Sequence, residues 1–268
     1  MKTSTHAGVV AAALALFTAG AALAQVEGVI TTPDGRKFEG SIKWKAREKV
    51  YAITQKGKNV ELEMAPNTIG DIQIARPKEL DAAMASVQQG NASLAVPVLE
   101  KIANDYLMLQ WDKVATRLLA DAHVKAGDAD KAVKVCEKVI AGNPEAAYLG
   151  EMAPAYWQAL LKLDRASKVE DLLAKAIKSG DRGASAAALT MRGDVILAAG
   201  DTNETAKKAL RDGYLRVVTL YKSERAALPE ALYKAAKCFE KLGQSARADQ
   251  MRSALKSEFA ASEWARKP

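Results

Sequence analysis

Hydrophobic residues follow two different periods along the chain, and the change falls close to Pro77. From Val26 to Ala75 apolar and polar residues alternate, as in KFEGSIKWK, where Phe38, Ile42 and Trp44 share one face. Strict alternation over such runs is typical of β-strands with one buried face. Beyond Pro77 the apolar residues recur every three to four positions, which indicates amphipathic helices.

The alternating region predicts five short strands. NVELEM and IGDIQIA repeat the alternation, and the breaks between runs carry the turn residues PDG, KGK and PN. We expect a small antiparallel β-module over residues 25–77, an SH3-like or Sm-like barrel, with a β-meander docked on the helices as the alternative. A module of this size makes a thin core and should depend on the helical region for stability.

The helical region is interrupted at regular intervals. The breaks are spaced by 37, 37, 36 and 43 residues and lie at Gly90, Gly127, Asp164, Gly200 and Gly243. Intervals of this size indicate a solenoid of stacked helix pairs.

The same residue types recur around these breaks. A small residue, suited to a close helix crossing, stands seven positions before four of them: Ala83, Ala120, Gly193 and Ala236. A second set of residues, expected to pack between the helices, stands five positions after four of the breaks: Ala95, Ala132, Val169 and Ala248. The pattern resembles the tetratricopeptide repeat, and ADAHVKAGDADKAVKVCEKVIAGNP matches it at nearly every position. The resemblance implies a mainly α fold, an α-solenoid of about five helix pairs over residues 78–268.

Two units depart from the pattern. The third has Trp157 where a small residue is expected and Asp164 in place of the turn glycine. In the fourth, the packing positions resume late after the break, at Leu210, Tyr214 and Val217.

The C-terminal units also look like the tandem units of bacterial periplasmic tetratricopeptide proteins, such as the Tol–Pal coordinator and the outer-membrane assembly factor with these repeats. The shared features are Ala-rich first helices and an aromatic residue near each unit's end, Tyr221 and Phe259.

His123 and Cys136 invite a catalytic interpretation, but the repeat explains their spacing. In the family these two positions face each other across the helix pair as packing residues. Cysteine catalysis would also need a group that orients the histidine and donors for an oxyanion. Zinc would need three or four close ligands. We therefore expect no catalytic site, no metal and no cofactor, and no disulfide between Cys136 and the distant Cys238.

The N-terminus, MKTSTHAGVVAAALALFTAGAALAQ, has a basic start, an uncharged run and the small-residue site Ala22–Ala24. This order predicts a cleavable secretory signal over residues 1–24, with a retained membrane anchor as the alternative. We expect an exported protein, in the periplasm, with secretion or outer-membrane association as other outcomes. Because the protein is expected to be exported, we expect no nucleic-acid partner, and any membrane contact would be peripheral.

The resemblance implies that the first helix of each unit lines a concave face that binds a partner protein or peptide. Carrying the family's positions onto this sequence gives the candidate contact residues Leu80, Met84, Val87, Arg117, Asp121, Val124, Gln158, Asp194, Tyr233, Lys237 and Glu240, with Glu151 and Thr190 beside them. The expected function is a non-catalytic exported adaptor or scaffold for envelope or secretion-machinery proteins.

A second hypothesis concerns the β-module. The chain has 39 Lys and Arg against 32 Asp and Glu, a net charge of +7, and Lys43, Lys45 and Arg47 lie close together. These three side chains are candidate contacts for an anionic glycan or lipid. On this hypothesis the module binds the envelope ligand and the repeats serve for multimerisation.

Overall fold

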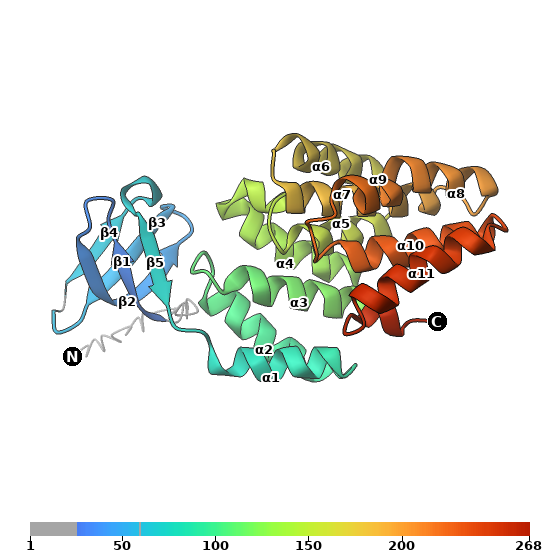
Figure 1. The fold of residues 1–268 in the computed structure, drawn as a ribbon. Coiled ribbons are helices and arrows are strands. Elements are labelled where there is room, and N and C mark those ends of the chain that lie inside the picture. Colours follow the sequence, from blue (N-terminus) through green and yellow to red (C-terminus); the bar gives the residue numbers. More distant parts are fainter. Residues whose placement is uncertain (1–25, 59) are drawn as a thin grey trace, which may run out of the picture.

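The computed structural model describes residues 26–58 and 60–268. The predicted secretory signal, residues 1–24, lies outside the described residues. A five-stranded antiparallel sheet is followed by helix pairs up to the C-terminus (Figure 1). The predicted fold class, a mainly α fold with a tetratricopeptide-like solenoid preceded by a small antiparallel β-module, is confirmed. In the described residues the module is a five-stranded antiparallel sheet, and the prediction of an SH3-like or Sm-like barrel stays a prediction.

The sheet has the strand order β4-β3-β2-β1-β5. Its strands are β1 (Val26–Thr31), β2 (Lys37–Lys45), β3 (Val50–Gln55), β4 (Glu61–Met64) and β5 (Asp71–Ile74), with a 3-10 turn at Pro66–Thr68. Because β5 returns to pair with β1, the last strand lies beside the first. The inward side chains Ile30, Ile42 and Ile53 are fully buried, as the alternation predicts.

Two glycines let the strands approach closely. Gly28 of β1 lies opposite Gly40 of β2. A Cβ added at Gly40 would lie 2.0 Å from the carbonyl oxygen of Thr54, and one at Gly28 would lie 2.7 Å from that of Gln73. Only glycine fits where another backbone comes this close, and such sites accompany bends in a sheet.

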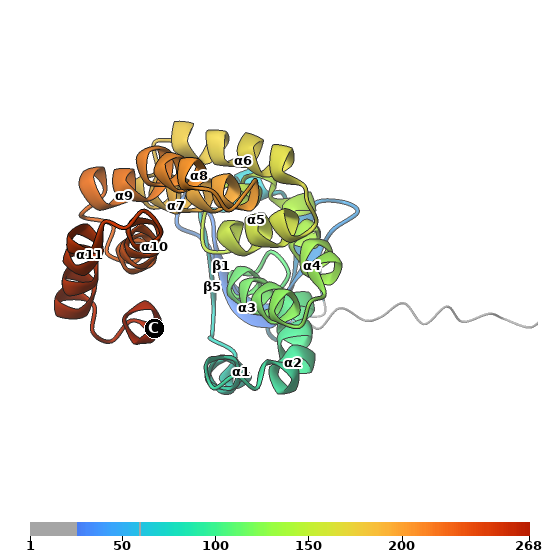
Figure 2. The same ribbon diagram turned by 90° about the vertical axis from the view of Figure 1, so that its right-hand side faces the viewer.

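The helices form pairs arranged along a curve (Figure 2). The pairs are α1 (Lys78–Gln88) with α2 (Ala92–Asp105), α3 (Asp112–Lys125) with α4 (Ala129–Gly142), α5 (Ala153–Lys162) with α6 (Ala166–Lys178), α7 (Arg182–Ala198) with α8 (Asn203–Ala209) and α9 (Leu215–Leu220), and α10 (Leu228–Lys241) with α11 (Ser245–Glu258). A 3-10 turn, Pro144–Ala147, precedes α5, and another, η4 (Glu263–Arg266), follows α11.

Every predicted break is a turn between the two helices of a pair. Gly90, Gly127 and Gly243 have positive φ angles of 85°, 86° and 69°, which favour glycine. Asp164 takes the same left-handed conformation with φ 55°, and Asp is one of the few other residues that tolerates it. At Gly200 the next helix begins instead with a capping box between Thr202 and Thr205.

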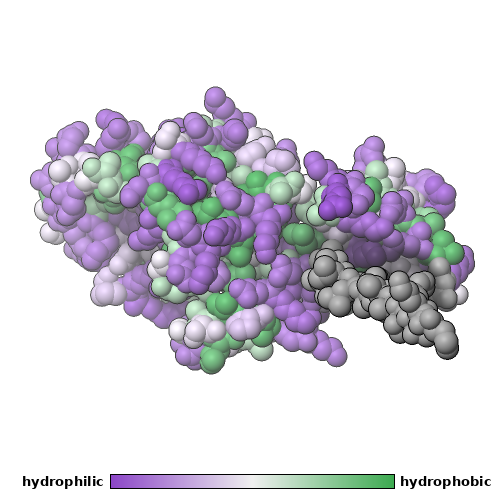
Figure 3. Space-filling model, turned by 180° about the vertical axis from the view of Figure 1, so that it is seen from behind, coloured by the Kyte–Doolittle hydropathy of each residue, from purple (hydrophilic) through white to green (hydrophobic). Residues whose placement is uncertain are grey.

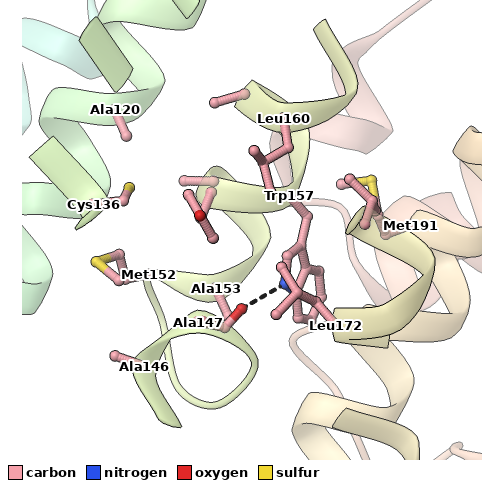
Figure 4. Packing of buried hydrophobic residues seen from close by; sticks show 14 of the residues in the cluster. Ala120, Cys136, Ala146, Ala147, Met152, Ala153, Trp157, Leu160, Leu172 and Met191 are labelled. Carbon is pink, nitrogen blue, oxygen red and sulfur yellow. Dashed lines mark hydrogen bonds between the residues drawn. The ribbon is translucent and has the colours of Figure 1, made fainter. Parts of the chain in front are cut away.

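Trp157, the large residue of the third unit, is completely buried. Figure 4 shows its ring beside Leu172 and Met191, with the small residue Ala147 opposite. The indole nitrogen donates a hydrogen bond of 2.8 Å to the carbonyl oxygen of Ala147. The small residue Ala147 opposite the ring and the satisfied indole donor therefore explain how a tryptophan replaces the expected small residue.

The fourth unit accommodates its late packing positions with a π-helical turn, Leu210–Tyr214, between α8 and α9. Such a turn inserts one extra residue into a helix and shifts the face that follows it. Leu210, Tyr214 and Val217 are all buried, as predicted. The ring of Tyr214 lies against Gly193, where an added Cβ would be 2.4 Å from it, so this crossing requires a glycine.

The β-module docks on the loop between α2 and α3. Leu109 of this loop is 1% exposed and packs in the core of the sheet with Ile30, Ile42 and Ile53. Tyr51 donates a hydrogen bond of 3.0 Å to the carbonyl oxygen of Met108, and the Trp111 indole donates one of 3.1 Å to that of Ile74. The solenoid thus completes the thin core of the sheet.

Candidate functional site: the inner face of the solenoid

The inner side of the curve is formed by α1, α3, α5, α7 and α10, the first helices of the five units (Figure 2). We call this surface the inner face. Figure 3, seen from behind the view of Figure 1, shows a mostly hydrophilic surface with hydrophobic residues scattered between polar ones. On the inner face itself, the candidate contacts include charged and aromatic side chains.

At the first unit the prediction was partly wrong. Leu80 is fully buried and Val87 is 7% exposed, and both belong to the core cluster that contains Leu99 and Leu119. Because α1 needs these residues to pack on α2 and α3, they are not available to a partner. Met84 is partly exposed and remains on the surface. Thr190 of α7 is likewise buried, and its hydroxyl donates to the carbonyl oxygen of Ala186.

The second unit presents Arg117, Asp121 and Val124, which are all partly exposed. The Arg117 guanidinium lies 3.5 Å from the carboxylate of Asp121 and 3.9 Å from that of Glu151. Burial raises the pKa of Asp121, and the carboxylates of Glu230 and Glu263 add to the effect. Arg117 and Lys125 act in the opposite direction on the pKa of Asp121. Gln158 of α5 is exposed.

Asp194 of α7 is the centre of a polar cluster. Its carboxylate accepts hydrogen bonds from the Tyr214 hydroxyl at 2.7 Å and from Lys234 Nζ at 2.6 Å. Lys234 also pairs with Glu230 at 2.5 Å. Burial works against the charge of Lys234, but the two carboxylates raise its pKa above the usual range. This side chain thus stays charged between α7 and α10.

A cavity of about 340 Å³ adjoins this cluster, with Lys237 and Lys241 in its lining. Sequence reasoning found Asp194 and Lys237 but missed Lys234. The signal was present in the sequence, since Glu230 and Lys234 are four residues apart on one helix, a spacing that brings opposite charges together.

In the last unit, Lys237 pairs with Glu240 at 3.6 Å, and Glu240 also pairs with Arg252. Tyr233 is covered by residues 262–268, which we call the C-terminal segment. The ring centroids of Tyr233 and Trp264 are 5.5 Å apart, and the Tyr233 hydroxyl donates to the Pro268 carbonyl oxygen at 3.2 Å. The sequence pattern gave no sign of this contact.

The candidate cations of the β-module have carboxylate partners. Lys43 lies 2.6 Å from Glu61, and Lys45 lies 2.5 Å from both Glu61 and Glu63. The pKa of Lys45 is raised, mainly by the hydrogen bond to Glu61. Arg47 is exposed in the turn after β2.

His123 and Cys136 are both buried. Burial raises the pKa of the Cys136 thiol to about 12 and lowers the pKa of His123. A protonated thiol and a neutral imidazole lack the charges of an activated pair. Cys136 and Cys238 are free thiols in different core clusters.

Within residues 26–58 and 60–268, no group of three or more His, Cys, Asp and Glu side chains is placed to hold a metal ion. Among the helices of the same residues, none combines the length and apolar character needed to cross a bilayer.

Comparison with known proteins identifies the class of repeat. Residues 230–262, which include most of α10 and all of α11, match the family model of the tetratricopeptide repeat. The chain is also similar to a crystal structure from Podosopora anserina described as kinesin light chain nearly identical TPR-like repeats. The identity is 16%, the alignment covers 69% of this chain and 95% of that chain, and the TM-score is 0.43.

A single-residue variant of the same repeats is 18% identical, with the same coverage and TM-score. There is no match among curated proteins. Residues 230–262 therefore carry a tetratricopeptide repeat, a kind of repeat that generally mediates the binding of partner proteins.

Proposed function

We propose that the protein is a non-catalytic adaptor that holds an envelope or secretion-machinery protein on the inner face of its solenoid. The observation that carries this proposal is the convergence of side chains from distant units. Asp194 of α7 and Lys234 of α10 are 40 residues apart in sequence, yet their side chains pair at 2.6 Å, and α3, which carries Asp121, lies on the same inner side of the curve (Figure 2). Stacked helix pairs present such surfaces to protein partners.

The proposal places the partner on α3, α5, α7 and α10. These helices carry the predicted contact residues Arg117, Asp121, Gln158, Asp194 and Lys237, which are partly or fully exposed. The exposed charges favour a partner with complementary polar groups. They would act on the specificity and the association rate more than on affinity.

The export of the protein and its periplasmic location are also part of the proposal. Support comes from the charged start, apolar run and small-residue site before Gln25. The likeness of the C-terminal units to periplasmic tetratricopeptide proteins agrees with it. N-terminal sequencing of the protein from fractionated cells should give a chain that begins at Gln25 in the periplasmic fraction. An intact N-terminus in the cytoplasm would contradict export while leaving the adaptor role open.

We favour the solenoid over the β-module as the binding surface. Lys43 and Lys45 have their charges matched by Glu61 and Glu63, which leaves Arg47 as the exposed cation of the three candidates. An anionic glycan or lipid would have to displace these carboxylates before it could pair with the lysines.

The test is crosslinking in intact cells followed by mass spectrometry of captured proteins. We would compare the wild type with a variant that carries Arg117→Glu and Lys237→Glu on the inner face. A matched control carries Lys134→Glu and Lys175→Glu on the exposed outer helices α4 and α6. Loss of specific envelope proteins from the first variant alone supports the proposal. Equal capture by all three proteins would refute an inner-face site.

A further inference from the structure

The C-terminal segment lies where a partner of the last unit is expected to bind. Tyr233 was predicted from the repeat as a contact residue, and Trp264 covers it with a centroid separation of 5.5 Å. Figure 2 shows the C-terminus on the side of α10 that faces α1 and α3. The turn η4 of this segment also packs against α10. One inner-face site is thus already occupied by the chain itself.

A short turn allows the chain to reach this position after α11. The backbone N–H of Ser262 donates to the carbonyl oxygen of Phe259 at 2.8 Å, and the Ser262 hydroxyl accepts from the N–H of Trp264 at 3.2 Å. The turn reverses the chain and brings the 3-10 turn η4 against α10. The segment is therefore tethered to its site by only a few residues.

The contacts of the segment are those of an aromatic and basic peptide. The Nζ of Lys234 lies 5.5 Å from the Trp264 ring centroid, and that of Lys267 lies 3.4 Å from it. The Tyr233 hydroxyl donates a hydrogen bond of 3.2 Å to the carbonyl oxygen of Pro268. Trp264 remains partly exposed, in contrast to the fully buried Trp157 of the core. Such contacts at the surface are individually weak and easily exchanged.

One feature of the segment opposes its binding. Glu263 is next to Trp264, whose ring lies 5.5 Å from Lys234 Nζ, and the same Nζ pairs with Glu230 at 2.5 Å. Glu263 therefore adds a second carboxylate close to that of Glu230. Like charges brought together in a partly buried place are unfavourable. A peptide with an aromatic residue and basic residues, but without this acid, has a better charge match to the same surface.

We infer that the C-terminal segment is an internal ligand for the inner face of the last unit, and that the partner's docking element is an aromatic residue followed by basic residues, which displaces it. This inference deepens the proposed function and rests on it for the identity of the surface. Since the tether keeps the segment at a high local concentration, the free site is only a minor fraction in the wild-type chain.

The test uses a labelled peptide with the sequence EFAASEWARKP, residues 258–268, and full-length proteins. Fluorescence anisotropy would measure its binding to the wild type and to Trp264→Ala, in which the segment loses its anchor. We expect the variant to bind the peptide about five-fold more tightly than the wild type, because the competing internal ligand is weakened. A peptide that carries Gln in place of Glu263 should bind more tightly still.

Two further variants define the site. Trp264→Phe keeps an aromatic ring and should bind the peptide as weakly as the wild type does. Adding Tyr233→Ala to Trp264→Ala should abolish the gain, because the receiving ring is removed. Circular dichroism would confirm that each variant is folded. Equal binding to wild type and Trp264→Ala, or no binding to either, would overturn the inference.

The result is separable from the test of the proposed function. If crosslinking shows a partner that depends on Arg117 and Lys237 but the peptide fails to bind Trp264→Ala, the adaptor role stands and the internal ligand is rejected. If the peptide binds Trp264→Ala but no cellular partner depends on the inner face, the internal ligand stands and the adaptor role is rejected.

Discussion

The solenoid is covered at both ends, and the two coverings differ in kind. At the first units the β-module docks through Leu109, which is 1% exposed, and through two hydrogen bonds from ring donors to backbone carbonyls. At the last unit the C-terminal segment docks through Trp264, which is partly exposed, with a tilted aromatic contact to Tyr233 and cation–π contacts. The first contact completes a hydrophobic core, whereas the second lies on a surface.

This difference indicates which of the two contacts can exchange during function. Burial of apolar area is worth roughly 25 cal/mol per Å², so removing the β-module from Leu109 and its neighbours would be costly. A surface aromatic pair contributes about 0.5–1.5 kcal/mol beyond its area. We therefore expect a permanent junction at the β-module and a reversible one at the C-terminal segment.

The largest effect is expected from Leu109→Ala. The substitution should lower the free energy of unfolding by about 2–5 kcal/mol, because it leaves a cavity in the core of the sheet. Urea denaturation followed by circular dichroism would measure it. The matched control is Leu94→Ala, since Leu94 is 72% exposed and should change stability by less than about 0.5 kcal/mol. Similar effects of the two substitutions would show that Leu109 does not anchor the module.

Tyr51→Phe is a milder change at the same junction. It removes the hydroxyl that donates to the carbonyl oxygen of Met108 and leaves that oxygen without this donor. The expected loss of stability is about 0.5–1.5 kcal/mol. Thermal unfolding would detect the change, and a melting temperature equal to that of the wild type would mean that water replaces the hydroxyl at no cost.

Trp264→Ala should affect the overall free energy of unfolding by about 1 kcal/mol or less, because its contacts are partly exposed. It should instead raise the rate of hydrogen exchange and proteolysis in residues 262–268, with α10 and α11 unchanged. If residues 262–268 of Trp264→Ala are protected from exchange and proteolysis as well as those of the wild type, the C-terminal contact is not the reversible one that we expect.

The smallest effect concerns Asp112, whose side chain is fully buried at the start of α3 next to the junction. Burial raises its pKa above the usual range, although Oδ2 accepts a 2.8 Å hydrogen bond from the N–H of Met108. A carboxyl with a raised pKa in the folded state lowers stability when ionised, so this cost is present above that pKa and disappears as the pH falls through it.

Asp112→Asn removes the ionisation and keeps an acceptor for Met108. The variant should therefore be more stable than the wild type at pH 7, with a difference that shrinks toward pH 4. Melting temperatures at several pH values would measure it. A difference that is constant with pH, or that grows on acidification, would show that Asp112 has no raised pKa.

Much of the fold could be predicted because it depends on local residue types. The turns at Gly90 and Gly127 need left-handed residues, and Asp164 could be assigned to the same place because Asp tolerates that conformation. Gly193 marks a close helix crossing, and the structure shows the ring of Tyr214 there. The repeat period can therefore be recognised from local residue types alone.

The candidate site was harder to predict because exposure depends on neighbours that the period does not specify. Leu80 and Val87 hold positions that face a partner in the family, but here α1 uses them for its own packing. Tyr233 was found, whereas the segment that covers it was not, since a contact between α10 and Trp264 has no periodic signal. Lys234 was overlooked although its spacing from Glu230 indicated an ion pair.

The paired charges of the β-module have a consequence for solubility. Strand β4 has only four residues, and in the described sheet it forms a ladder with β3 alone. An open strand edge is a template for intermolecular pairing and aggregation, which proteins limit with short edge strands and charged side chains. Glu61 and Glu63 place two carboxylates on this edge, and Lys43 and Lys45 reach across β3 to hold them there. These ion pairs would thus keep neighbouring molecules apart at high concentration.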